Sequence, residues 1–149
     1  MPWQGGTILT GKGWHPLTQS EGGYMSEQQT RDALERFLEA FSRQDIDAMV
    51  ELMHGDVVEE YPQSGERTRG KDNARSVYEN YPSIPNLVDY GYRVAGDMGV
   101  VEMTLDYDGH RMNVCEVVEF EDGKIKRSTG YFAEPFEAPE WRAQWVEKM

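Results

Sequence analysis

The chain has 149 residues, enough for one domain with a buried core, and a formal net charge of −12. This acidity argues against binding to nucleic acids or anionic membranes, because both require clusters of Lys and Arg. No apolar run approaches the roughly 20 residues of a membrane-spanning helix, and no secretory signal is visible at the N-terminus. The single cysteine, Cys115, cannot form an internal disulfide. Together these features favour a cytoplasmic protein.

Residues 1–24 differ from the rest of the chain, because they are rich in glycine and lack helical or strand periodicity. We interpret this segment as a flexible leader. The alternative is that Trp3 or Trp14 covers a pocket or a partner subunit. Met25 begins a Met-Ser-Glu sequence that resembles a natural start, so we expect the folded domain to span residues 25–134, followed by a tail of residues 135–149.

Three segments carry apolar residues at positions i, i+3, i+4 and i+7, the period of a helix with one buried face. They are Leu34, Phe37, Leu38 and Phe41; Ile46, Met49, Val50 and Met53; and Ala74, Val77, Tyr78 and Tyr81. Ser26 and Gln29 fit a capping box for the first helix. Asp45 is placed to cap the second helix, Gly55 to end it, and Pro82 to stop the third.

The segments between and after these helices are predicted to be strands. Residues 56–62 form the first, and residues 87–94 and 101–107 follow the third helix. Asp108-Gly109 and Asp122-Gly123 are signals for tight hairpins with primed turns. The predicted fold is therefore α+β: a cone-shaped, curved antiparallel sheet closed by three N-terminal helices (a cystatin-like α+β barrel), with a short C-terminal helix.

The tail contains two tryptophans on that short helix. Pro139 suits its first turn, and Trp141 and Trp145 are spaced to stack at i and i+4. We expect them to pack on the outside of their own sheet. The alternatives are a dimer contact or a flap beside the mouth of a pocket.

From about Arg31 to Glu134, the chain resembles the nuclear-transport-factor-2-like superfamily and, within it, the SnoaL-like (polyketide cyclase-like) group. The resemblance rests on element order and three local signatures: residues 37–45, residues 60–70 and residues 120–125. It implies the cone fold and a homodimer formed through the exposed sheet face. The fold hosts isomerases, cyclases, epoxide hydrolases, dehydratases and non-catalytic binding modules, so it does not define the reaction.

The ketosteroid isomerases of this superfamily provide a comparison for the predicted pocket. In the aligned sequences, their general-base aspartate falls on Tyr61, their oxyanion-hole tyrosine on Phe37 and their protonated aspartate on Val118. Phe37 and Val118 cannot donate a hydrogen bond. Tyr61 is a poor base at neutral pH, because the reference pKa of tyrosine is about 10. Isomerisation by that mechanism is therefore not expected.

Strand alternation on the aligned fold predicts that Glu59 and Glu116 face one apolar cavity. A buried, unpaired carboxylate protonates or finds a partner, so such a group can act as an acid or a base near neutral pH. We assign Glu116 as the acid/base, Tyr61 as an orienting hydrogen-bond donor and Glu59 as a modulator. The alternatives are that Glu59 points to solvent, or that Glu116 pairs with an arginine: Arg67, Arg69 or Arg127.

On the last strand, Ser128, Gly130 and Phe132 are expected to face the cavity. Strict alternation would then turn Ile125 outward and Lys126 inward, so we predict a bulge near these two residues. Tyr90 and Tyr92 are expected in the core or the pocket wall. The predicted ligand-binding residues are Phe37, Phe41, Tyr78, Met103, Tyr107, Val118 and Phe132.

We expect no metal site, because no two histidines have metal-ligand spacing. His54 is interpreted as a surface or capping histidine after the second helix, and residues 65–70 as a turn into the third. The leading hypothesis is a cofactor-independent cyclase, isomerase or hydratase acting on a small hydrophobic or aromatic molecule. The alternatives are a non-catalytic binding module and a dimeric interaction module of the same fold.

Overall fold

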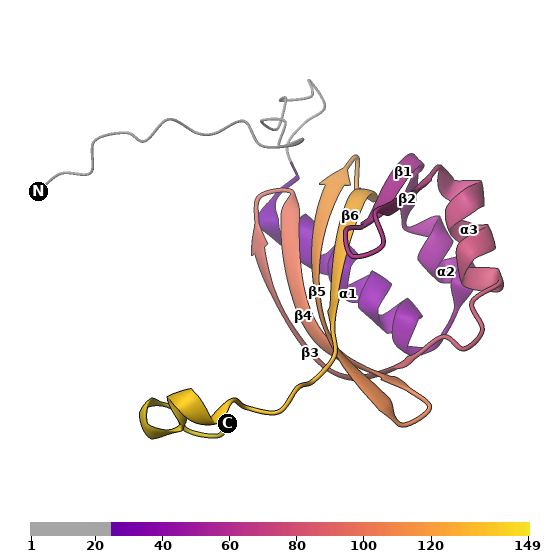
Figure 1. The fold of residues 1–149 in the computed structure, drawn as a ribbon. Coiled ribbons are helices and arrows are strands. Elements are labelled where there is room, and N and C mark those ends of the chain that lie inside the picture. Colours follow the sequence, from indigo (N-terminus) through magenta and orange to yellow (C-terminus); the bar gives the residue numbers. More distant parts are fainter. Residues whose placement is uncertain (1–24) are drawn as a thin grey trace, which may run out of the picture.

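The computed structural model describes residues 25–149 and is drawn in Figure 1. Its helices are α1 (Glu27–Ser42), α2 (Ile46–Glu51), α3 (Lys71–Glu79) and the 3-10 helix η1 (Glu140–Trp145). Its strands are β1 (Met53–Tyr61), β2 (Glu66–Arg69), β3 (Asn86–Ala95), β4 (Met98–Tyr107), β5 (His110–Glu121) and β6 (Lys124–Ala133). None of the helices in this part of the chain is long and apolar enough to cross a membrane. The prediction for the leader lies outside the described residues.

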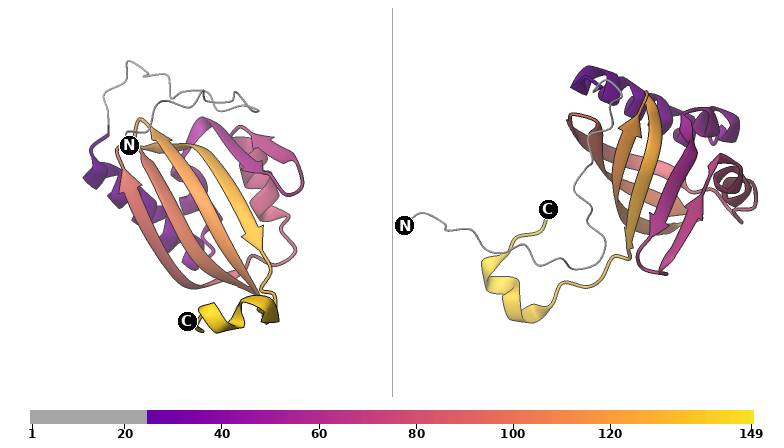
Figure 2. Two further views of the ribbon diagram at one scale, coloured as in Figure 1. Left: turned by 60° about the vertical axis from the view of Figure 1, so that its left-hand side comes forward. Right: turned by 90° about the horizontal axis from the view of Figure 1, so that it is seen from above.

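The strands form one curved sheet in the order β2-β1-β6-β5-β4-β3. All neighbours are antiparallel except β1 and β6, which run parallel. The helices α1, α2 and α3 lie on one side of this sheet, as the two views of Figure 2 show. The α+β cone predicted from the sequence is therefore confirmed, with one parallel strand pair in an otherwise antiparallel sheet.

The first two helices begin where the sequence predicted. The side chains of Ser26 and Gln29 each bond the other's backbone N–H, which completes the capping box. The Asp45 carboxylate accepts a bond from the Ala48 N–H, 3.0 Å away, at the start of α2. The predicted end of α2 at Gly55 is wrong, because β1 begins at Met53, which pairs with Ile125 of β6.

Both predicted primed turns are confirmed, because φ is positive at both central residues of each. Asp108 and Gly109 have φ of 54° and 93°, and Asp122 and Gly123 have 51° and 76°. Residues 65–70, interpreted as a turn, contain the strand β2, which pairs with β1 and places Glu59 opposite Thr68. Gly70, with φ of 82°, then precedes α3.

The core lies between α1 and the inner face of the sheet. Leu34 and Leu38 of α1 pack with Val101, Met103 and Leu105 of β4 in one buried cluster. The buried hydroxyl of Thr30 donates a 2.7 Å hydrogen bond to the Gly96 carbonyl, which fixes α1 against the β3–β4 turn. A Cβ at Gly99 would lie 3.0 Å from the Leu34 side chain, so this glycine permits the close approach of helix and sheet.

The bulge predicted on β6 is present at Lys126. Glu119 pairs with Arg127 and Phe120 with Ile125, so Lys126 has no opposite residue on β5. Ile125 and Ser128 are both buried, although regular alternation would turn residues three positions apart to opposite faces of the sheet. The bulge changes the alternation of the strand and places both side chains on the inner face.

The tail does not pack as expected. η1 is a 3-10 helix, in which residues i and i+4 do not lie above one another, so Trp141 and Trp145 cannot stack as predicted. Their exposed fractions are 73% and 72%, which excludes packing on their own sheet. Figure 1 shows the tail extending away from the cone.

Candidate functional site

A cavity of about 430 Å³ lies between the helices and the inner face of the sheet. This volume is within the range of small-molecule sites. All ten side chains proposed from the sequence as site residues lie on its wall: Phe37, Phe41, Glu59, Tyr61, Tyr78, Met103, Tyr107, Glu116, Val118 and Phe132. The sequence therefore identified residues from α1, α3, β1, β4, β5 and β6 that the fold brings together.

Glu59 is buried in β1 with 4% of its surface exposed, so the alternative that it points to solvent is wrong. The Tyr78 hydroxyl donates a 2.9 Å hydrogen bond to Oε1 of Glu59. Its Oε2 is buried without a hydrogen-bond partner among the described residues. Burial raises the Glu59 pKa to about 7; the hydrogen bond from Tyr78 opposes this rise, and the negative charge of Glu116 adds to it.

Glu116 lies on β5, two strands away from Glu59, with β6 between them. Ser128 of β6 is the register partner of both Glu59 and Val118, and Gly130 is the partner of Glu116. Desolvation raises the pKa of Glu116, and the Ser128 hydroxyl partly opposes this effect. Ser128 therefore lies between the two carboxyl groups on the cavity wall.

The arginines considered as partners of Glu116 lie elsewhere. Arg127 and Arg67 pair with Glu60, with N–O distances of 3.1 and 3.7 Å. Arg69 is in register with Val58, on the face opposite to Glu59. The alternative of an ion-paired Glu116 is therefore wrong.

Three tyrosines supply neutral hydroxyl groups to the cavity. Burial raises the pKa of Tyr61, Tyr78 and Tyr107, and the charge of Glu59 contributes to the first two. The Tyr107 hydroxyl lies 3.3 Å from that of Tyr81. All three remain protonated at neutral pH, but the Tyr78 proton is donated to Glu59, so Tyr61 and Tyr107 are the ones that can donate hydrogen bonds to a ligand.

The rest of the wall is apolar and aromatic. Phe37 and Phe41 project from α1, Met103 from β4, and Phe132 from β6. A Cβ on Gly130 would lie 3.0 Å from the Phe132 ring, so this glycine lets the ring lie against the strand beside Glu116. Flat, largely apolar molecules fit such a surface.

Some features of the site were not predicted. Gln63, Ser64 and Glu66 reach the cavity from the β1–β2 turn and β2, and β2 was not predicted as a strand. The signal available for this strand was residues 66–69, Glu-Arg-Thr-Arg, in which arginine recurs at every second position before Gly70. Tyr92 packs against the core as expected, but Tyr90 is 48% exposed on the edge strand β3 and does not line the cavity.

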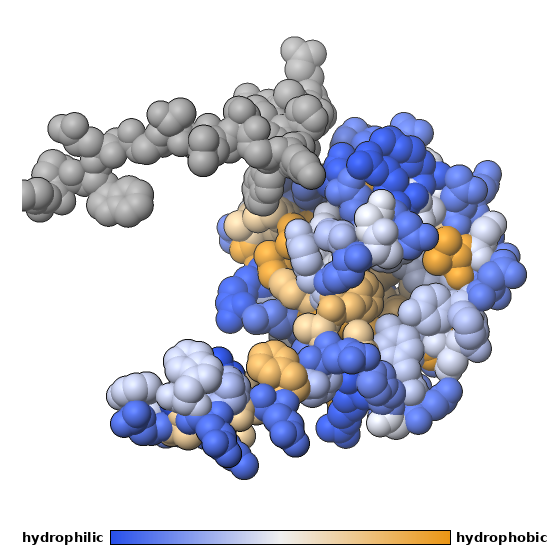
Figure 3. All heavy atoms as spheres, in the orientation of Figure 1, coloured by the Kyte–Doolittle hydropathy of each residue, from blue (hydrophilic) through white to orange (hydrophobic). Residues whose placement is uncertain are grey.

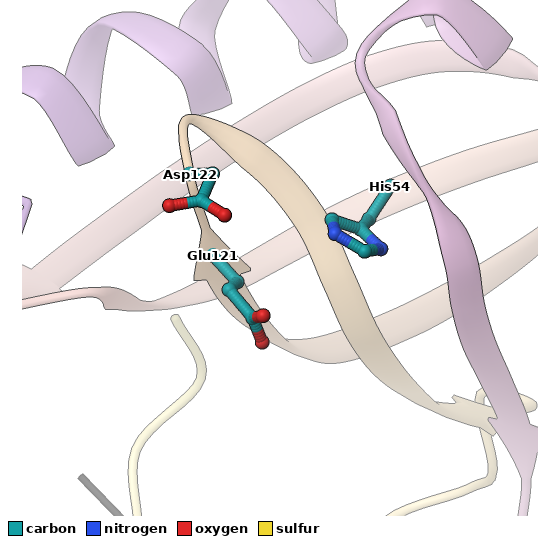
Figure 4. Close-up of side chains that lie close together, drawn as sticks. All are labelled: His54, Glu121 and Asp122. Carbon is teal, nitrogen blue, oxygen red and sulfur yellow. The ribbon is translucent and has the colours of Figure 1, made fainter. Parts of the chain in front are cut away.

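A second cluster lies on the outside of the sheet, where ligand atoms of His54, Glu121 and Asp122 come within 4.8 Å of one another (Figure 4). His54 follows α2 as predicted, but it is the second residue of β1 and does not cap the helix, whose C-cap is Leu52. The Lys126 ammonium lies 3.3 Å from its Nδ1 and 3.8 Å from the Glu121 carboxylate. Because a lysine already supplies the positive charge, we interpret this cluster as an ion-pair network.

Comparison with known proteins defines the family. The sequence model of the SnoaL-like domain matches residues 34–128, and the chain belongs to this family. A nuclear-transport-factor-2-like protein of unknown function from Burkholderia xenovorans is 33% identical, with a TM-score of 0.73 over 83% of this chain and 97% of its own. No curated protein matches the sequence.

Two further solved structures share the fold. A candidate ketosteroid isomerase from Kribbella flavida is 24% identical, with a TM-score of 0.77 over 83% of this chain and 91% of its own. An LEH-like epoxide hydrolase from Mycobacterium tuberculosis is 24% identical, with a TM-score of 0.58 over 71% of this chain and 84% of its own. At this identity the similarity defines the fold and not the reaction.

Proposed function

We propose that the cavity binds a small hydrophobic or aromatic molecule and carries out cofactor-independent acid–base chemistry on it. The observation that carries this proposal is the pair of carboxyl groups, Glu59 and Glu116, on a largely apolar and aromatic wall. Groups with strongly raised pKa values in a cavity are candidates for proton transfer near neutral pH.

The two carboxyl groups are suited to different roles. Burial raises the pKa of both groups, and the negative charge of Glu116 adds to the rise at Glu59, so the pair holds a proton near pH 7. Glu59 then acts as the proton donor and Glu116 as the base. Tyr78 orients Glu59 through its hydrogen bond, and Tyr61 is a donor for a polar atom of the substrate. This revises the modulator role first assigned to Glu59.

Cyclisation, isomerisation and hydration can all use a proton donor and a base within reach of one reacting group. The proteins named as a candidate isomerase and an epoxide hydrolase support this general class. The ketosteroid isomerase mechanism itself is disfavoured, since Phe37 and Val118 line the cavity without a hydrogen-bond donor.

The test starts from the molecule that co-purifies with the chain, identified by native mass spectrometry, and follows its binding and conversion. We expect Glu116→Gln and Glu59→Gln each to reduce turnover at least about 100-fold, because general acid–base catalysis contributes about 10²–10⁴-fold. Glu60→Gln is the matched control, because Glu60 is the next residue of β1 and pairs with Arg127 outside the cavity. Unchanged binding and turnover in Glu116→Gln would refute the assignment. Retention of an unconverted ligand by all three proteins would instead favour the binding module.

We also propose a homodimer formed through the outer face of the sheet. In register, Val100 lies opposite Val117, and Cys115 opposite Tyr131, with their side chains on the face away from α1. Tyr131 is 48% exposed, and hydrophobic residues gather over the strands in Figure 3. Light scattering tests this assembly: Val117→Arg should give monomers, and a monomeric parent protein at micromolar concentration would contradict it.

A further inference from the structure

The charge of the cavity wall restricts the ligand more closely than its shape does. The wall carries the carboxyl groups of Glu59 and Glu116 and, in addition, that of Glu66, which is exposed to solvent. No Lys, Arg or His from residues 25–149 lines it. An ionised carboxylate in such surroundings lacks the positive partner that buried charges normally have.

The aromatic residues of the wall reinforce this preference. Seven aromatic side chains border the cavity: Phe37, Phe41, Tyr61, Tyr78, Tyr81, Tyr107 and Phe132. The faces of aromatic rings attract cations, and more strongly when water is excluded. The wall therefore combines two features that favour a positive ligand, namely ring faces and unpaired carboxyl groups.

The unpaired oxygen of Glu59 is an independent sign of an incomplete polar arrangement. Buried oxygen atoms almost always have a hydrogen-bond partner, yet Glu59 Oε2 has none among the described residues. Glu60, one residue along the same strand, has two arginine partners within 4 Å. The outward-facing carboxylate of Glu60 therefore has positively charged partners, whereas the inward-facing carboxyl groups of Glu59 and Glu116 have none among the described residues.

We propose that the ligand of this cavity is a hydrophobic amine, bound as its ammonium ion between the Glu59 and Glu116 carboxyl groups with its apolar body against the aromatic wall. This inference rests on the proposed function, since it names the chemical class that the same cavity accepts; with an amine bound, the ammonium group replaces the Glu59 proton as the donor of the pair. An ammonium group supplies donors and positive charge to both carboxyl groups. A carboxylate ligand would instead add a like charge to the same wall.

Three probes with one aromatic body separate the possibilities: 2-(2-naphthyl)ethylamine, 2-(2-naphthyl)ethanol and 2-naphthylacetate. Their binding to the full chain is measured by isothermal titration calorimetry at pH 8. We expect the amine to bind at least about tenfold more tightly than the alcohol, and the acetate at least about tenfold more weakly, because charge-assisted hydrogen bonds are about twice as strong as neutral ones.

The carboxyl groups are tested by a double substitution, Glu59→Gln with Glu116→Gln, against Glu60→Gln. The double variant should bind the amine and the alcohol equally, whereas Glu60→Gln should keep the preference of the parent. Circular dichroism checks that both variants fold. If the double variant does not fold, the ranking of the three probes on the parent chain still decides the question.

The pH dependence provides a second measurement. Alkyl ammonium groups have a pKa of about 10, so the probe stays charged while Glu59, with a pKa of about 7, titrates. The groups that surround Glu59 are Tyr61 on β1, Tyr78 on α3, Glu116 on β5 and Ser128 on β6. The affinity for the amine should rise between pH 5.5 and pH 8, and binding of the amine at pH 6 should release the proton of Glu59. The affinity for the alcohol should not change over this range.

The outcomes are distinct. Equal or tighter binding of the alcohol at pH 8 would overturn the inference and leave the proposed binding of hydrophobic molecules intact. An amine affinity that does not change with pH would also overturn it. The absence of binding by all three probes would contradict both the inference and the proposed function.

Discussion

Replacing Glu59 by glutamine should change how the stability of the protein depends on pH. In the folded chain, burial raises the Glu59 pKa from its ordinary value of 4.5 to about 7. The folded state therefore binds this proton more tightly than the unfolded state does. The stability from the protonated carboxyl is fully present below pH 4.5 and is lost as the pH rises through 7.

The magnitude follows from linkage. A rise in pKa from 4.5 to about 7 corresponds to about 3 kcal/mol, most of which is lost between pH 5 and pH 8. Glutamine is uncharged and can still accept the Tyr78 hydrogen bond. We therefore expect the free energy of unfolding of Glu59→Gln, relative to that of the parent, to increase by about 2 to 3 kcal/mol over this range.

Urea denaturation at pH 5, 6, 7 and 8 measures this difference. Far-UV circular dichroism is the suitable signal, because residues 25–134, which form the cone, contain no tryptophan. Glu60→Gln is the control, and its stability should follow the parent at every pH. Parallel curves for Glu59→Gln and the parent would refute the reasoning, because they would mean that Glu59 titrates normally in the folded state.

Further predictions concern other parts of the molecule. Tyr78→Phe should raise the Glu59 pKa above about 7, as followed by carbon NMR of the carboxyl group, because the hydrogen bond that opposes the rise is lost; an unchanged pKa would contradict this. Gly130→Ala should weaken probe binding at least about tenfold in calorimetry, because the new Cβ must displace the Phe132 ring 3.0 Å away; unchanged affinity would mean that the ring moves freely. Arg127→Met should cost less than about 1 kcal/mol in urea denaturation, since its pair with Glu60 is partly exposed, and a larger loss would show that the pair is structurally essential. Deletion of residues 135–149 should leave the melting temperature of the cone unchanged, because Phe136, Trp141 and Trp145 are exposed; a clear decrease would show that the tail packs on the cone.

Features set by short-range interactions were predicted from the sequence. The Ser26 capping box and the two Asp-Gly turns depend on residues within a few positions of one another, so their patterns are visible in the chain itself. Met103 and Tyr107 of β4 were placed on the cavity wall for a similar reason, because the alternation of this strand is regular. The cavity wall followed from these elements together with the family resemblance.

Features that depend on distant partners were not predicted. β1 begins at Met53 because that residue pairs with Ile125, far along the chain. β2 is a four-residue edge strand whose existence depends on its pairing with β1. The tail is similar: its two tryptophans indicated a packed helix, but their environment is set by tertiary contacts that the sequence does not contain.

The bulge at Lys126 links the fold to the chemistry of the cavity. Ile125 faces the interior, so strict alternation would also turn Arg127 inward, on the strand between Glu59 and Glu116. A guanidinium there would pair with the carboxyl groups and lower their pKa values. The extra residue instead places Ser128 on the inner face and leaves Arg127 outside with Glu60. The raised pKa of Glu59 and the unpaired negative wall of the cavity both depend on this one-residue change of register.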